Sequence, residues 1–121
     1  MPILVYFILA WDALTGRRPL ERAADEQARV DAETSQLALY HFQMCPYCRK
    51  VRRDIRLLGL TIEQRDIQRN PARRVELIAG GGNKQVPCLR VVEADGSVRW
   101  LYESRVITRY LSDRFGNVVG A

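Results

Sequence analysis

Short apolar runs and amphipathic segments alternate along residues 37–115 of this 121-residue chain. Residues 37–42 are apolar and aromatic, which is typical of a buried strand. Residues 47–58 repeat apolar side chains at helical spacing, and residues 60–67 again have the composition of a strand. The pattern therefore predicts a strand–helix–strand unit.

The pattern after this unit predicts a helix, a hairpin and a final helix. The helix is expected to begin near residue 70 and to end at glycines 80–82, which we interpret as a flexible approach to the next segment. Residues 88–92 and 97–101 are apolar runs joined through an Asp-Gly pair, which is typical of hairpin turns. The final helix is expected to follow and to end at Phe115 and Gly116.

We interpret residues 1–36 as an amino-terminal extension that precedes one domain at residues 37–117. Residues 20–36 are rich in helix-forming residues but have few apolar positions. We interpret them as a mostly solvated helix that links the start of the chain to the domain.

An apolar run at residues 2–11 has two interpretations. It stops at Asp12, short of the roughly 18 residues that a membrane-spanning helix needs. In one interpretation residues 1–14 attach the protein to the cytoplasmic face of a membrane, because the arginines that follow favour the cytoplasmic side. In the other, they pack on the domain or on a second subunit.

Cys45-Pro46-Tyr47-Cys48 lies between the first predicted strand and the first helix. Pro46 suits a first helical turn, because the amide that it lacks would have no partner there. Cys45 is thereby expected at the helix amino terminus, where free amides and the helix dipole favour the reactive thiolate. Cys48 follows within one turn and can attack the Cys45 sulfur to resolve a mixed disulfide. The sequence therefore predicts a redox dithiol.

Metal and structural roles for the cysteines are the alternatives. A closed zinc site needs four ligands, and besides the dithiol the chain offers only His41 and Cys88, so we predict no metal site. Cys88 is expected to be a buried small hydrophobic residue, with a regulatory disulfide to Cys45 as the alternative. Three cysteines without a secretory signal pattern indicate a reducing compartment, and we predict the cytoplasm.

The chain is basic, with 19 Lys and Arg against 14 Asp and Glu and a formal net charge of +5. The predicted helix after Cys45 is the most basic stretch, because it carries five Lys or Arg side chains and only Asp54 among acids. This charge permits acidic partners. No named nucleic-acid-binding motif is present, so we predict no nucleic-acid partner.

Three motifs in this order resemble the glutaredoxins and the amino-terminal domain of glutathione S-transferases: Cys45-Pro46-Tyr47-Cys48, Val86-Pro87, and Glu103-Ser104 before an apolar helix. The resemblance spans about residues 37–115. It implies an α/β, thioredoxin-like (glutaredoxin) fold, in which helices flank a four-stranded mixed sheet.

The resemblance also implies the roles of site residues. Cys45 would be the nucleophile and Cys48 the resolving thiol. The residues that would bind glutathione are Tyr47, Val86, Pro87, Glu103 and Ser104. Among them, Pro87 would be in the cis form, the Val86 backbone would pair with the cysteinyl part, and Glu103 and Ser104 would hold the γ-glutamyl end.

The chain departs from the glutaredoxin pattern at Phe42, where those proteins commonly carry a lysine. The loss of this cation shifts the stabilisation of the thiolate to the helix dipole and the arginines. The cation that would bind the glycine carboxylate of glutathione is not set by a motif, and four residues are candidates: Arg69, Arg73, Arg74 and Lys84.

The function that the resemblance implies is a glutathione-dependent thiol–disulfide oxidoreductase. Its partners would be glutathione and proteins that contain disulfides or glutathionylated cysteines. Two alternatives stay open: a glutathione S-transferase-like enzyme that uses glutathione as co-substrate, and a non-enzymatic redox sensor or iron–sulfur cluster scaffold.

Overall fold

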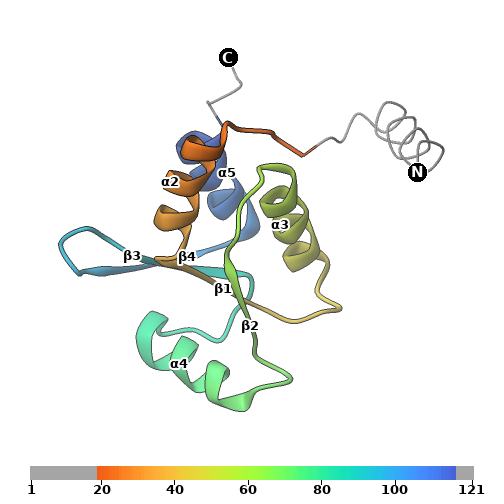
Figure 1. Cartoon of the computed structure of the whole chain (residues 1–121). Coiled ribbons are helices and arrows are strands. Elements are labelled where there is room, and N and C mark those ends of the chain that lie inside the picture. The colour runs from red at the N-terminus through yellow and green to blue at the C-terminus, as the bar shows by residue number, and fades with distance from the viewer. Residues whose placement is uncertain (1–18, 117–121) are drawn as a thin grey trace.

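Helices on both faces of a single sheet make up the part of the chain that the structure, a computed structural model, describes: residues 19–116 (Figure 1). The sheet has four strands in the order β2-β1-β3-β4, with bounds β1 Leu37–His41, β2 Glu63–Asp66, β3 Cys88–Val92 and β4 Val98–Tyr102. β1 pairs with β2 in parallel and with β3 antiparallel, and β3 and β4 form an antiparallel hairpin.

Three helices cover one face of the sheet and one helix covers the other (Figure 1). The first group comprises α2 (Ala24–Thr34), α3 (Pro46–Leu57) and α5 (Ser104–Phe115), and the opposite face carries α4 (Pro71–Gly81). A four-stranded mixed sheet between helices is the thioredoxin-like arrangement, so the predicted fold class is confirmed.

The main core lies between the sheet and the three-helix face. Leu39 and Leu89 from the central strands meet Val51 from α3 and Ile107 from α5, and all four side chains are fully buried. Because side chains alternate along a strand, neighbouring residues form a smaller cluster under α4. That cluster includes Tyr40, Leu77 and Cys88.

The second strand is shorter than the predicted residues 60–67. The amide of Leu60 donates to the carbonyl of Ile55 at 3.0 Å, which keeps this residue tied to the end of α3. Leu60 and Ile62 are buried in the main core, and pairing with β1 begins only at Glu63.

Helix α2 is mostly exposed, as the sequence predicts, but it also packs on the domain. Its Val30 side chain belongs to the main core. The segment before it is fastened to the neighbouring helices, because the Leu20 amide donates to the Leu57 carbonyl at 2.7 Å and Arg22 donates to the Phe115 carbonyl at 2.9 Å. Residues 20–34 therefore pack on the domain as well as lead into it.

The prediction that glycines 80–82 form a flexible segment is wrong for two of the three positions. Gly80 and Gly81 lie within α4 and let it approach β4 closely. A Cβ at Gly80 would lie 2.1 Å from the Trp100 ring, and one at Gly81 would lie 2.0 Å from the Tyr102 hydroxyl. Only Gly82, with φ of 84°, ends the helix in the left-handed conformation that favours glycine.

The membrane interpretation concerns residues 1–14, which lie outside the described residues. Within residues 19–116, no helix has the length and apolar character to cross a bilayer. The division of the chain at residue 36 stays a prediction.

Candidate active site

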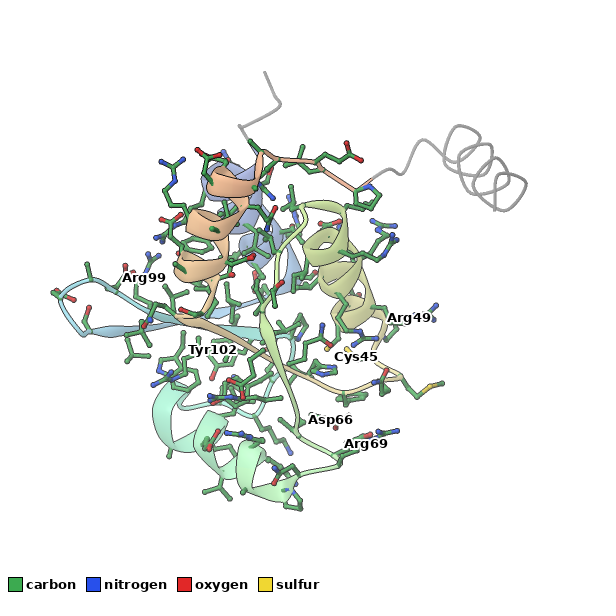
Figure 2. The ribbon with its side chains drawn as sticks, viewed as in Figure 1. Cys45, Arg49, Asp66, Arg69, Arg99 and Tyr102 are labelled. Atoms are coloured by element: carbon green, nitrogen blue, oxygen red, sulfur yellow. The ribbon has the colours of Figure 1, made fainter. Side chains whose placement is uncertain are left out.

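Cys45 caps the amino terminus of α3, as the sequence predicts (Figure 2). Its Sγ accepts a hydrogen bond from the Cys48 amide at 3.4 Å, and Pro46 occupies the first turn. Both cysteines are free thiols, and Cys45 is 6% exposed whereas Cys48 is fully buried. The first sulfur therefore faces a free helix amide, which is a position that favours an anion.

Cys48 differs from Cys45 in its surroundings. Burial, followed by the hydrogen bond with Cys45, raises the pKa of the Cys48 thiol well above its ordinary value. Two adjacent thiolates would also repel each other, which further opposes the loss of the Cys48 proton. We infer that Cys48 keeps its proton until the neighbouring sulfur has reacted.

Arg52 holds the loop that leads from β1 to Cys45. Its Nη1 lies 3.0 Å from Nδ1 of His41, and its Nη2 donates to the Gln43 carbonyl at 3.1 Å. A longer contact of 3.4 Å joins Nη1 to the Phe42 carbonyl. The positive charge also favours the thiolate form of Cys48, although burial outweighs it. Arg52 thus brings a cation to the loop in which Phe42 takes the place of a lysine.

His41 is the buried partner of Arg52, since only 3% of it is exposed. Burial is the main cause that lowers the pKa of His41, and the Arg52 charge is the second. A neutral imidazole can accept the guanidinium hydrogen at Nδ1 and keep its own proton on Nε2. Sequence analysis missed the Arg52–His41 pair, because nothing in the sequence separates Arg52 from the other basic residues of α3.

One cavity of about 220 Å³ gathers all the residues that the resemblance assigns to glutathione. Its lining includes Tyr47, Gln85, Val86, Pro87, Glu103 and Ser104. The Val86–Pro87 peptide bond is cis, as expected. Gln85 was not predicted, and no motif marks it.

A second cavity, of about 600 Å³, contains Cys45 and shares Gln85 and Val86 with the first. Two of the four candidate cations, Arg74 and Lys84, line it. The other two do not. Arg73 pairs instead with Glu63 and Glu76, and Arg69 lies beyond Asp66 at the end of β2 (Figure 2).

Glu103 has an unusual backbone at the start of α5. Its φ of 73° makes it the one non-glycine residue with positive φ among residues 19–116. Such a conformation costs about 1–3 kcal/mol and is typical of functional sites. The next two residues, Ser104 and Arg105, open the helix and line the same cavity, so the first turn of α5 with its free amides lies beside it.

The described residues offer no group of three or more His, Cys, Asp or Glu side chains arranged to hold a metal ion.

A family model described as "Glutathione S-transferase, N-terminal domain" matches residues 39–118. Among solved structures, maleylacetoacetate isomerase from Anaeromyxobacter dehalogenans 2CP-1, with bound dicarboxyethyl glutathione and citrate, is 30% identical with a TM-score of 0.52. The alignment covers 69% of this chain and 39% of that enzyme. The same isomerase with bound GSH is 29% identical with a TM-score of 0.53, over 69% of this chain and 39% of that one.

Glutathione S-transferase unclassified 2 from Bombyx mori is 27% identical with a TM-score of 0.54, over 68% of this chain and 37% of that one. The chain thus spans well under half the length of these enzymes. A search of curated protein sequences gave no match.

Proposed function

This chain belongs to the family of glutathione S-transferase N-terminal domains, and we propose that it is a glutathione-dependent thiol–disulfide oxidoreductase in which Cys45 is the nucleophile. One observation carries the proposal. The cavity that contains Cys45 and the cavity that contains Glu103 and Ser104 share Gln85 and Val86, so a single extended molecule can reach all of these groups.

Glutathione has the charges that this pair of cavities can recognise. Its γ-glutamyl end would lie at Glu103 and Ser104, with the amino group on the Glu103 carboxylate and the carboxylate on the free amides of α5. Its cysteinyl part would lie along Val86, beside Cys45. Its glycine carboxylate would point to Arg74 and Lys84, which line the same cavity as Cys45.

In the proposed reaction, the Cys45 thiolate attacks the glutathione sulfur of a protein–glutathione mixed disulfide. The bond between the two sulfurs of the substrate breaks, and the target cysteine leaves as a thiolate that takes a proton from water. A second glutathione thiolate then attacks the glutathione sulfur now bound to Cys45. This step releases oxidised glutathione and restores the Cys45 thiolate.

A protein disulfide would follow a second route through Cys48. Cys45 attacks one sulfur of the target and forms a mixed disulfide with it. Cys48 then gives its proton to water and attacks the Cys45 sulfur. The bond between Cys45 and the target breaks, both target thiolates take protons from water, and Cys45 and Cys48 are left as a disulfide. Two glutathione molecules reduce this disulfide. A reducing compartment such as the cytoplasm would supply them.

The proposal is tested by the turnover of a glutathione mixed disulfide in an assay coupled to glutathione reductase. Cys45→Ser should abolish turnover, because no other thiol of the described chain lies on the cavity. Cys48→Ser should keep this turnover and lose the reduction of protein disulfides. Cys88→Ser is the matched control and should retain both. Full activity of Cys45→Ser would contradict the proposal.

The second candidate function is an isomerase or transferase that uses glutathione as co-substrate. It is favoured by the 30% identity to the maleylacetoacetate isomerase that holds dicarboxyethyl glutathione. There the thiol of glutathione itself would attack the substrate, and Cys45 would do no more than donate a hydrogen bond to it. Isomerisation of maleylacetoacetate that survives Cys45→Ser, without disulfide exchange by the intact protein, would favour this function.

A further inference from the structure

Two large side chains close to Cys45 in the sequence stand exposed, one before it and one after it. Met44 is 82% exposed and Tyr47 is 66% exposed, whereas Cys45 between them is 6% exposed. Exposed apolar groups that are gathered at a reactive position are typical of a surface that another molecule covers. Only Tyr47 also lines a glutathione cavity, and Met44 lines neither of the two.

Helix α3 also carries a basic face close to Cys45 in the sequence. Pro46, Arg49, Lys50 and Arg53 line a shallow depression of about 430 Å³. These four positions follow the spacing i, i+3, i+4 and i+7, which places them on one side of a helix. Figure 2 shows Arg49 beside Cys45, at the start of α3. We call this face, together with Met44 and Tyr47, the basic platform.

The charges of the basic platform are poorly compensated. Arg53 has one distant contact, 3.8 Å to Asp54, and within residues 19–116 no ion pair involves Arg49 or Lys50. Several arginines elsewhere in the described chain do lie beside carboxylates. Such pairs are Arg65 with Glu63, Arg73 with Glu76, Arg99 with Glu93 and Arg114 with Glu33.

The helix itself gains nothing from this arrangement. The first turn of α3 has no acidic residue, and its dipole makes a cation there unfavourable. Arg49 and Lys50 are also absent from the lining of both glutathione cavities, where other cations, Arg74 and Lys84 among them, are available. A partner other than glutathione can therefore supply negative charge to these two side chains.

We propose that the basic platform docks an acidic polypeptide segment whose cysteine is brought to Cys45. This inference rests on the proposed function, because it names the substrate class of the same site. A polypeptide suits the platform better than a nucleic acid does, since the partner must bring a sulfur to Cys45 and cover the apolar Met44 and Tyr47.

Residues 46–53 span about 10 Å of helix, which an extended peptide covers in about three or four residues. The acidic residues are therefore expected within about four positions of the target cysteine.

The first test measures binding alone. Three fluorescent peptides carry serine in place of the target cysteine and have acidic, neutral or basic flanks, and anisotropy measures their affinity for the full chain at low salt. The acidic peptide should bind at least about fivefold more tightly than the neutral one, and added salt should remove the difference. Equal affinities for the acidic and the neutral peptide would overturn the proposal.

Two matched double variants locate the surface. Arg49→Gln/Lys50→Gln removes two charges from the basic platform and should abolish the preference for the acidic peptide. Arg29→Gln/Arg99→Gln removes the same charge from α2 and β4, and Figure 2 shows Arg99 far from Cys45. This control should keep the preference. An equal loss in both doubles would assign the effect to net charge and overturn the proposal.

Turnover separates the docking surface from the proposed function. With glutathionylated versions of the peptides, the ratio of kcat/KM for acidic over neutral flanks should fall in Arg49→Gln/Lys50→Gln, and the ratio cancels any effect on Cys45 itself. Selective binding without any turnover, even of a small mixed disulfide, would support the docking surface and contradict the oxidoreductase function.

Competition with a single-stranded oligonucleotide tests the class of partner. If it displaces the acidic peptide at lower concentration than a free acidic peptide does, the surface is assigned to nucleic acid and the docking proposal is overturned.

Discussion

Replacement of Arg52 by glutamine is expected to loosen the loop that carries Cys45. In the structure this guanidinium donates to Nδ1 of His41 at 3.0 Å and to the Gln43 carbonyl at 3.1 Å. Glutamine is shorter and neutral, so it cannot make both contacts from the same helix position. The change removes the charge and the contacts and leaves the apolar core untouched.

The magnitude follows from the burial of the two partners. A hydrogen bond to a charged group contributes about 1.5–3 kcal/mol when its partner is buried, and His41 is 3% exposed. The contact with Gln43 is exposed and contributes roughly 0–1 kcal/mol. The 3.4 Å contact with Phe42 is too long to count. We expect a loss of about 2 kcal/mol in the free energy of unfolding near neutral pH.

The cost should depend on pH because of His41. Burial and then the Arg52 charge lower the pKa of His41 in the folded protein, so the unfolded chain binds the proton more readily. The folded state therefore loses stability as the pH falls below the unfolded value of about 6.5. Without Arg52 one of the two causes that lower the His41 pKa is gone. The variant therefore loses less stability on acidification than the original protein does. The substitution should thus cost less at about pH 5 than at about pH 7.5.

Urea unfolding of both proteins at the two pH values measures these differences. Arg56→Gln is the matched control, since it makes the same change on an exposed position of the same helix and should cost well under about 1 kcal/mol. The rate at which Cys45 is alkylated should also change in Arg52→Gln and not in the control. An Arg52→Gln cost equal to that of Arg56→Gln, or one that grows toward acid pH, would refute the role of Arg52.

Two further predictions concern the backbone around the site. Gly80→Ala should destabilise the protein by about 1–3 kcal/mol, because the clash of its Cβ with the Trp100 ring outweighs the gain of up to about 1 kcal/mol in helix propensity. Urea unfolding checks this against Gly82→Ala, which meets no atom within 4 Å and should show only the cost of its positive φ. Glu103→Gly should raise stability by about 1 kcal/mol, since it relieves the positive φ, while it weakens glutathione binding in calorimetry at least about tenfold. Unchanged affinity would remove Glu103 from the glutathione site.

Local signals in the sequence were sufficient to predict the helix start at Cys45 and the hairpin turn. Pro46 and the apolar spacing of α3 are enough to place Cys45 at a helix start, because both act within a few residues. The Asp-Gly hairpin is confirmed in the same way, with Gly96 at a φ of 89°. These features depend on short-range backbone chemistry, which the sequence contains in full.

Features that depend on distant partners were not predictable in this way. Gly80 and Gly81 look like a flexible segment until β4, about twenty residues later, brings two aromatic rings against them. Arg52 resembles every other cation of α3 until the fold places His41 beside it.

The choice among the four candidate cations is of the same kind. Arg73 forms ion pairs with carboxylates of β2 and α4, whereas Arg74 and Lys84 line the cavity that contains Cys45. Only the packed structure separates these side chains, because their sequence environments are alike.

The most direct test of the proposed chemistry is the intact mass of the Cys48→Ser protein after incubation with oxidised glutathione. Without the resolving thiol, the Cys45–glutathione disulfide should persist. We expect one glutathionyl adduct, which peptide mapping assigns to Cys45 and which reduced glutathione removes. A protein that stays unmodified, or that carries its adduct on Cys88, would contradict Cys45 as the nucleophile of a glutathione-dependent oxidoreductase.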